Sequence, residues 1–238
     1  MAKLTLDDLV TQLKAAFGGD LTAVVLYGSA AGGEHNPKRS DQNVLVIVKQ
    51  VPMNVAKAVA ATASAWADAG NPPPLVFTES EWRGSADIFP MEYSDILDRH
   101  RVLHGAPPFD GISVKREDLR LQLENEAMGK LLHLRQAMLA SANDDKKLIQ
   151  VVTGTVSAIM VIFRAVTRLH GEKPGADNTA LVEQVARLAQ LDPEPFQKAV
   201  RVARGETAAV PKAETLVTAA GYVGGMERLV RHLDAYRG

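Results

Sequence analysis

Two short polar motifs stand at the borders of apolar segments and carry groups that could contact phosphate and metal. Gly28 and Ser29 directly follow an apolar run, and Asp41 and Asn43 directly precede another. A glycine leaves space for a phosphate to approach the backbone, and a serine can donate its hydroxyl and amide to phosphate oxygens. Because alternate residues of a strand point to the same face, positions 41 and 43 can present their oxygens to one cation. These residues are compatible with a site for a phosphate-bearing ligand, and the alternative is a pair of ordinary turns at the ends of strands.

This pattern resembles the nucleotidyltransferase superfamily, which includes DNA polymerase beta and the antibiotic and minimal nucleotidyltransferases. The superfamily places a Gly-Ser pair after its first core strand and an Asp-x-Asp pair at the head of the next. Gly28-Ser29 and Asp41-x-Asn43 hold those places here, and the resemblance covers roughly residues 5–105. It implies that Gly28 and Ser29 hold the triphosphate of a nucleotide. Arg39 is a further candidate for phosphate contact, with an exposed loop cation as the alternative.

A third carboxylate is the remaining part of the site that the resemblance implies. In the superfamily, the Asp-x-Asp pair and a carboxylate from a later strand hold magnesium ions, which bridge the phosphates and activate the attacking hydroxyl. The resemblance thus implies Mg²⁺ and a nucleoside triphosphate as ligands, with Asp41, Asn43 and Glu92 as the catalytic and metal-binding set. Glu92 is the preferred third carboxylate, and Asp87 and Asp95 are the alternatives.

Asn43 departs from the superfamily pattern, which has Asp or Glu at this position. An asparagine can offer a carbonyl oxygen to a metal but carries no charge, and the loss of one of three carboxylates weakens the attraction for a hard divalent ion. Two interpretations follow. Either Asp41 and Glu92 hold a single metal with Asn43 as a neutral ligand, or the fold has lost catalysis and kept nucleotide or partner binding.

Apolar runs and turn-forming residues predict the elements that position these side chains. β-branched and aromatic residues followed by Gly28 predict a strand at 21–27, and a second apolar run predicts one at 44–48. Helical spacing of apolar residues predicts helices at 6–17 and 51–69. Further expected elements are strands at 74–78, 88–93 and 101–104 and a short helix after a capping box of Thr78 and Glu81. The predicted fold class is α/β (α+β), a nucleotidyltransferase-type mixed sheet with flanking helices.

Residues 105–111 combine glycine, proline and aspartate and separate two regions of different pattern. After them we expect helices only, at 119–139, 148–169, 179–188, 193–204 and 211–236. The sequence therefore predicts a nucleotidyltransferase-like domain at 1–106 and an all-α helical bundle domain at 112–238. Gly221, Gly224 and Gly225 favour close packing of the last helix on a neighbour, with a break in that helix as the alternative.

Composition restricts the function classes. The 238 residues carry a formal net charge of −1, which argues against a nucleic-acid partner, and the lack of cysteine excludes a disulfide framework and a thiolate nucleophile. The six histidines show no compact metal-ligand spacing. An N-terminus without a signal-peptide pattern predicts a cytoplasmic protein. The apolar stretch 148–163 is short for a bilayer span and contains polar residues, so it predicts a buried bundle helix and no membrane.

Three functional hypotheses follow from the sequence. In the first, the protein transfers a nucleoside monophosphate from a nucleoside triphosphate to a hydroxyl acceptor, which is an antibiotic, a protein or a nucleic-acid end, and the helical domain selects that acceptor. In the second, it is a non-catalytic module that binds nucleotide or a protein partner, including as a homodimer through its helices. Asn43 favours the second hypothesis, whereas Gly28-Ser29 favours nucleotide contact. In the third, an unrelated α/β fold is joined to a dimerisation bundle.

Overall fold

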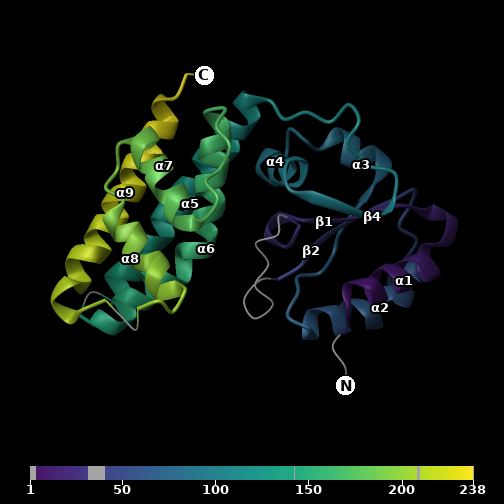
Figure 1. Cartoon of the computed structure of the whole chain (residues 1–238), viewed down its shortest axis with the longest axis horizontal. Coiled ribbons are helices and arrows are strands. Elements are labelled where there is room, and N and C mark those ends of the chain that lie inside the picture. The colour runs from purple at the N-terminus through teal and green to yellow at the C-terminus, as the bar shows by residue number, and fades with distance from the viewer. Residues whose placement is uncertain (1–3, 32–40, 142, 208–209, 238) are drawn as a thin grey trace. The chain divides into compact units, whose positions relative to one another are not determined.

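The computed structural model describes residues 4–31, 41–141, 143–207 and 210–237. The chain divides into two compact units, Met1–Val114 and Lys115–Gly238. The first unit contains all the strands of the described residues, and the second is built from helices (Figure 1). This change from strands to helices coincides with the change of sequence pattern after residue 111.

A four-stranded mixed sheet forms the centre of the first unit. Its strands are β1 (Leu21–Tyr27), β2 (Asn43–Val48), β3 (Leu75–Thr78) and β4 (His100–Gly105). They lie in the order β3-β2-β1-β4, with β1 antiparallel to both β2 and β4, and with β2 parallel to β3. The two long apolar strands, β1 and β2, therefore occupy the centre of the sheet, where both of their faces are covered.

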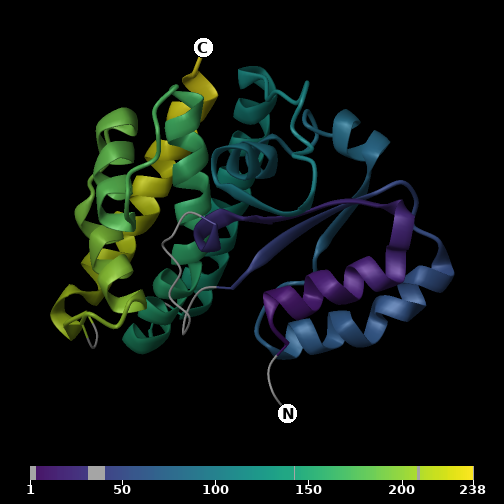
Figure 2. The ribbon, with the colours of Figure 1, turned by 45° about the vertical axis from the view of Figure 1, so that its right-hand side comes forward.

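Helices cover the two faces of this sheet (Figures 1 and 2). On one face, α1 (Leu6–Phe17) and α2 (Met53–Asp68) pack over alternate residues of β1 and β2, including Val24 and Val46. On the other face, α3 (Glu79–Gly84) and α4 (Pro90–Asp98) pack over the intervening residues, including Val25 and Leu45. Successive side chains of a strand point to opposite faces, which explains why the central residues of both strands are continuously apolar.

The strand predicted at residues 88–93 is wrong, because this segment enters helix α4 (Pro90–Asp98). Pro90 lies in the first helical turn, where a missing backbone N–H has no partner to lose and the fixed φ suits a helix. Tyr93 and Ile96, three residues apart, are both buried against the sheet. Glu92 and Asp95 are consequently carried by a helix and not by a strand.

The capping box predicted at Thr78 is confirmed. The Thr78 hydroxyl accepts from the Glu81 backbone N–H at 3.3 Å, and the Glu81 carboxylate accepts from the Thr78 backbone N–H at 2.8 Å. Helix α3 therefore begins directly at the end of β3. This turn brings Trp82 into the core, where its ring stacks on Tyr93 of α4 with centroids 4.1 Å apart.

Helix α6 is the central helix of the second unit and packs against its four neighbours. The helices of this unit are α5 (Arg116–Ser141), α6 (Asp145–Leu169), α7 (Asn178–Ala189), α8 (Glu194–Ala203) and α9 (Thr215–Ala235). Among the helices of the described residues, α6 alone is long and apolar enough, by length and composition, to cross a membrane. Its residues Ile159, Phe163 and Val166 are completely buried. Packing within the bundle buries 44% of the apolar window of this helix.

Two glycines let α9 approach α8 closely. A Cβ on Gly221 would lie 2.7 Å from Pro195 Cγ, and a Cβ on Gly225 would lie 2.7 Å from Phe196 Cζ. Helix α9 continues through both positions. The predicted close packing is therefore confirmed for Gly221 and Gly225, and the alternative of a broken helix is wrong. A Cβ on Gly224 would meet nothing within 4 Å.

Alanine at position 225 is expected to destabilise the protein, whereas alanine at 224 is not. The methyl group of Gly225→Ala would overlap the buried Phe196 ring and lower the free energy of unfolding by about 1–2 kcal/mol. Gly224→Ala meets no such obstacle and should raise it by up to about 1 kcal/mol, because alanine favours a helix. Urea denaturation of both variants measures the difference. Equal effects at the two positions would contradict the close packing of α9 on α8.

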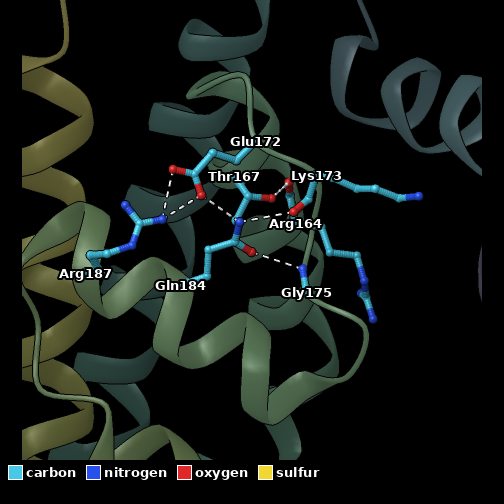
Figure 3. A network of polar contacts seen from close by, with 7 residues as sticks. All are labelled: Arg164, Thr167, Glu172, Lys173, Gly175, Gln184 and Arg187. Atoms are coloured by element: carbon cyan, nitrogen blue, oxygen red, sulfur yellow. Dashed lines mark hydrogen bonds and ion pairs between the residues drawn. The ribbon is translucent and has the colours of Figure 1, made fainter.

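Gln184 of α7 holds the connection between α6 and α7 (Figure 3). Its side-chain amide donates to Glu172 Oε2 at 2.7 Å and to the Lys173 carbonyl at 3.1 Å. Its Oε1 accepts from the Gly175 backbone N–H at 3.0 Å. Arg187, one turn further along α7, donates to both carboxylate oxygens of Glu172, at 2.9 and 2.6 Å. The loop that follows α6 is thereby fixed against α7.

His170 and His232 form a polar pair between the C-terminal ends of α6 and α9. Their Nε2 atoms lie 2.9 Å apart, so one ring donates and the other accepts when both are neutral. The ring of Tyr236 meets His170 edge-on, and its hydroxyl donates to the Leu169 carbonyl at 3.0 Å. Protonation of both rings would place two positive charges at this contact.

The protein is expected to lose stability as the pH falls below about 6.5, the ordinary pKa of histidine. Burial lowers the pKa of His170, with a further lowering from Arg187 and Arg116 that Glu172 opposes. Burial and the neighbouring His170 lower the pKa of His232. The unfolded chain therefore takes up protons at a higher pH than the folded pair, so the stability present at neutral pH is lost on acidification.

Urea midpoints measured across this pH range test the histidine pair. His232→Gln removes one titrating ring and should flatten the loss of stability, while His133→Gln, at an exposed position of α5, should leave the pH profile unchanged. A wild-type profile identical to that of His232→Gln would show that the pair does not control the acid sensitivity.

Candidate functional site

The turn after β1 is built on a glycine that the backbone conformation requires. Gly28 has a φ of +77°, a region that residues with a Cβ rarely adopt. Its N–H donates to the carbonyl of Arg99 at 3.0 Å, and its carbonyl accepts from the N–H of Ala31 at 3.1 Å. The chain therefore leaves β1 in a single tight turn, Gly28–Ala30.

Asn43 lies beside this turn because β1 and β2 are paired. Tyr27, the last residue of β1, is the antiparallel partner of Asn43, the first residue of β2. A Cβ on Gly28 would lie 3.5 Å from Asn43 Nδ2 and 3.6 Å from Asp95 Oδ2. Side chains from β2 and α4 thus lie within ordinary van der Waals contact of the position that a Cβ would take on Gly28.

Asp41 stands at the entrance to β2 and is exposed. The residue that follows it is anchored, because the backbone N–H of Gln42 donates to Asn71 Oδ1 at 2.9 Å. Asn71 lies in the connection between α2 and β3. The start of β2 is therefore held by its neighbours on both sides, by β1 through Tyr27 and by this connection through Asn71.

Three carboxylates act electrostatically on Tyr27. Burial, followed by the negative charges of Asp95, Glu92 and Asp41, raises the pKa of Tyr27 to about 12. The phenol consequently keeps its proton throughout the physiological range.

An arginine neutralises the carboxylate nearest to Gly28. Arg99 Nη2 lies 2.8 Å from Asp95 Oδ1, and the side chains retain only 19% and 24% of their exposure. The two residues are one helical turn apart, at the C-terminal end of α4, where a cation also interacts favourably with the helix dipole. Arg99 thus contacts the site twice, through its guanidinium and through the carbonyl that accepts from Gly28.

The residues predicted from the sequence are brought together to different degrees. Asp41, Asn43 and Glu92 all lie around the Tyr27–Gly28 turn. Among the alternatives for the third carboxylate, Asp95 lies beside Gly28, whereas the charge of Asp87 acts on Tyr93, whose hydroxyl donates to the Trp82 carbonyl.

Two of the predicted site residues are only partly or not at all described by the structure, and three residues at the site were not predicted. Ser29 belongs to the turn, but its side chain lies outside the described structure, as does the whole of Arg39. Sequence reasoning missed Tyr27, Asn71 and Arg99. The i,i+4 spacing of Asp95 and Arg99 could have indicated their ion pair, but only once the segment had been assigned to a helix.

The donor set does not fit the magnesium site that three carboxylates would form. Neither later strand, β3 nor β4, contains an acidic residue, and the third carboxylate expected from a strand is therefore missing. Asn43 brings no charge, and Asp95 is already paired with Arg99. Within the described part of the chain, no group of three or more His, Cys, Asp or Glu side chains is arranged to hold a metal ion.

Comparison with known proteins gives a similarity to solved structures. No family model and no curated protein matches the sequence. The structure is similar to the crystal structure of the spectinomycin adenyltransferase AAD(9) from Enterococcus faecialis, with a TM-score of 0.58 at 11% sequence identity. The similarity covers 93% of this chain and 98% of that chain, which was solved with ATP and spectinomycin.

This similarity confirms the predicted fold class. A mixed sheet with flanking helices is followed by an all-helical region, as expected for a nucleotidyltransferase fold. At 11% identity the comparison establishes the fold alone. Function depends on the residues of the site and not on the fold alone.

Proposed function

We propose that this protein is nucleotidyltransferase-like and binds a nucleoside triphosphate at the turn of Gly28. The observation that carries the proposal is the glycine turn itself, with its φ of +77° and with the polar side chains of Asn43 and Asp95 in van der Waals reach of the position that a Cβ would take. A phosphate oxygen can reach a backbone that carries no side chain, as in other glycine-based phosphate sites. The similar adenyltransferase was solved with ATP, which supports a nucleotide as the ligand.

A second candidate function is transfer of the nucleoside monophosphate to a hydroxyl acceptor, and the carboxylates around Tyr27 favour it. In this reaction the acceptor oxygen bonds to the α-phosphorus, the bond to pyrophosphate breaks, and the hydroxyl proton passes to a base. Asp41 is the candidate base, because it is exposed and lies close enough for its charge to act on Tyr27. The similar protein was solved with spectinomycin, which supports a small-molecule acceptor.

Asparagine at position 28 tests the proposed nucleotide site. Asn tolerates positive φ better than other residues with a Cβ, so Gly28→Asn should fold. Its side chain would lie against Asn43 and Asp95, where the phosphate is proposed to bind, and the rise in melting temperature that ATP produces in the wild type should be lost. Thermal shift with ATP, and with AMP as a ligand that lacks the β- and γ-phosphates, measures this effect.

Gly111→Asn is the matched control. Gly111 has a φ of +76° in the same unit, and a Cβ there would meet nothing within 4 Å. This variant should carry the same backbone strain and keep the full response to ATP. If Gly28→Asn responded to ATP as strongly as Gly111→Asn, the nucleotide would not bind at this turn, and the proposed function would lose its main support.

A further inference from the structure

We propose that the guanidinium of Arg99, acting through Asp95, takes the place of a divalent cation in this site, so that a triphosphate binds at Gly28 without magnesium. The inference rests on the proposed nucleotide site. It concerns the positive charge of Arg99, which lowers the repulsion between the site and a negatively charged triphosphate. Arg99 is in this view a positioning residue, because it neutralises a carboxylate and is not assigned a contact with the reacting atoms.

The positive charge of Arg99 lies next to the carboxylate that faces Gly28. Asp95 places Oδ2 beside Gly28 and gives Oδ1 to Arg99 Nη2 at 2.8 Å. The carbonyl of Arg99 accepts from the N–H of Gly28 at 3.0 Å. One residue therefore holds the backbone of the turn and neutralises the carboxylate that faces it.

Electrostatics explains why a cation is needed here. Asp41, Glu92 and Asp95 all lie near the end of β1, and a triphosphate approaching Gly28 would meet three negative charges. Arg99 compensates one of them within a partly buried pair, where screening by water is reduced. Asn43, which also lies beside Gly28, is neutral and adds no further negative charge. Both features reduce the repulsion between the carboxylates and the triphosphate, which a metal ion would otherwise have to screen.

A purely structural ion pair gives a different expectation. Asp95 and Arg99 have the spacing of an ordinary i,i+4 pair on a helix, and such a pair supports the helix only modestly. Its removal would change the melting temperature but not the ratio of ATP affinities with and without magnesium. That ratio is therefore the measurement that separates the two roles.

The experiment is calorimetric titration of the full chain with ATP, in EDTA and in magnesium. For the wild type, the dissociation constants for ATP in EDTA and in magnesium should agree within about threefold. This difference corresponds to less free energy than one charge-assisted hydrogen bond contributes. Arg99→Gln removes the guanidinium charge beside Asp95 and should weaken binding in EDTA by about tenfold or more, with magnesium restoring much of the loss. Arg101→Gln, at an exposed arginine of β4, should behave as the wild type.

A double variant keeps the test independent of folding defects. Asp95→Asn/Arg99→Gln removes both charges, and it should bind ATP in EDTA more tightly than Arg99→Gln alone. The inference is overturned if the wild type binds ATP only with magnesium, or if Arg99→Gln matches the wild type in EDTA. Both of those outcomes leave the nucleotide site intact. A wild type that binds ATP under neither condition would instead contradict the proposed function itself.

Discussion

Replacement of Gly105 by alanine is expected to lower the free energy of unfolding by about 3 kcal/mol. Gly105 ends β4 with a φ of +78°, and a Cβ there would overlap the carbonyl oxygen of Thr22 and come within 3.1 Å of Ala23 Cα. These are backbone atoms of β1, which cannot move aside as a flexible side chain can. The variant must therefore separate β4 from the central strand or distort both, in addition to adopting an unfavourable φ.

Guanidinium or urea denaturation of Gly105→Ala measures this loss, and Gly111→Ala is the matched control. Gly111 has nearly the same φ, +76°, but a Cβ there would meet nothing within 4 Å. It should cost only about 1 kcal/mol, the expense of positive φ alone. Equal destabilisation of the two variants would show that β4 and β1 do not pack as closely as the structure indicates.

The close approach at Gly105 also matters for the site. Strand β4 runs from His100 to Gly105, and Arg99, directly before it, accepts the hydrogen bond from Gly28. A displaced β4 would therefore disturb the position of Arg99 at the other end of the strand. We expect Gly105→Ala to weaken ATP binding even at temperatures where most of the protein is still folded.

Asn43→Asp is expected to create a dependence on magnesium. The substitution places a carboxylate at the head of β2, two residues after Asp41 and beside Gly28. In EDTA the added negative charge should weaken ATP binding. With magnesium, a second hard oxygen ligand should strengthen it, so that the ratio of the two affinities changes by about tenfold or more.

Titration with ATP in EDTA and in magnesium measures this ratio, and pyrophosphate release from ATP in the presence of candidate hydroxyl acceptors reports transfer. Asn43→Ala is the control, because it removes the amide without adding a charge and should not respond to magnesium. Equal affinity of Asn43→Asp in both conditions would mean that position 43 does not face the phosphates. A rise in pyrophosphate release in Asn43→Asp would favour the interpretation that the wild type is a weakened transferase.

Much of the fold could be predicted because its signals are local. The apolar run at 21–27, ended by Gly28, became β1 with the same bounds, and apolar residues at helical spacing became α1. Thr78 and Glu81 cap α3 as their spacing indicated. In each case the residues that form the element also contain the information that ends it, so no knowledge of distant contacts was required.

Segment 88–93 shows where local signals were insufficient. Pro90 suits either an irregular strand or the first turn of a helix, and the choice depends on the sheet surface that buries Tyr93 and Ile96. The error propagated to the site, because Glu92 was expected on a strand. Arg99 was overlooked for the same reason, since its relation to Asp95 exists only when both residues belong to one helix.

The residue types at the Gly28 turn and at the head of β2 could be read directly, because glycine, aspartate and asparagine have chemical properties that do not depend on the rest of the chain. Which acids meet that glycine was settled by long-range pairing. The register of β1 with β2 brings Asn43 to Tyr27, and the packing of α4 on the sheet brings Asp95 and Arg99 to the same point. Charge balance in a site depends on the positions of all its members, and those positions arise only when strands and helices far apart in the sequence come together.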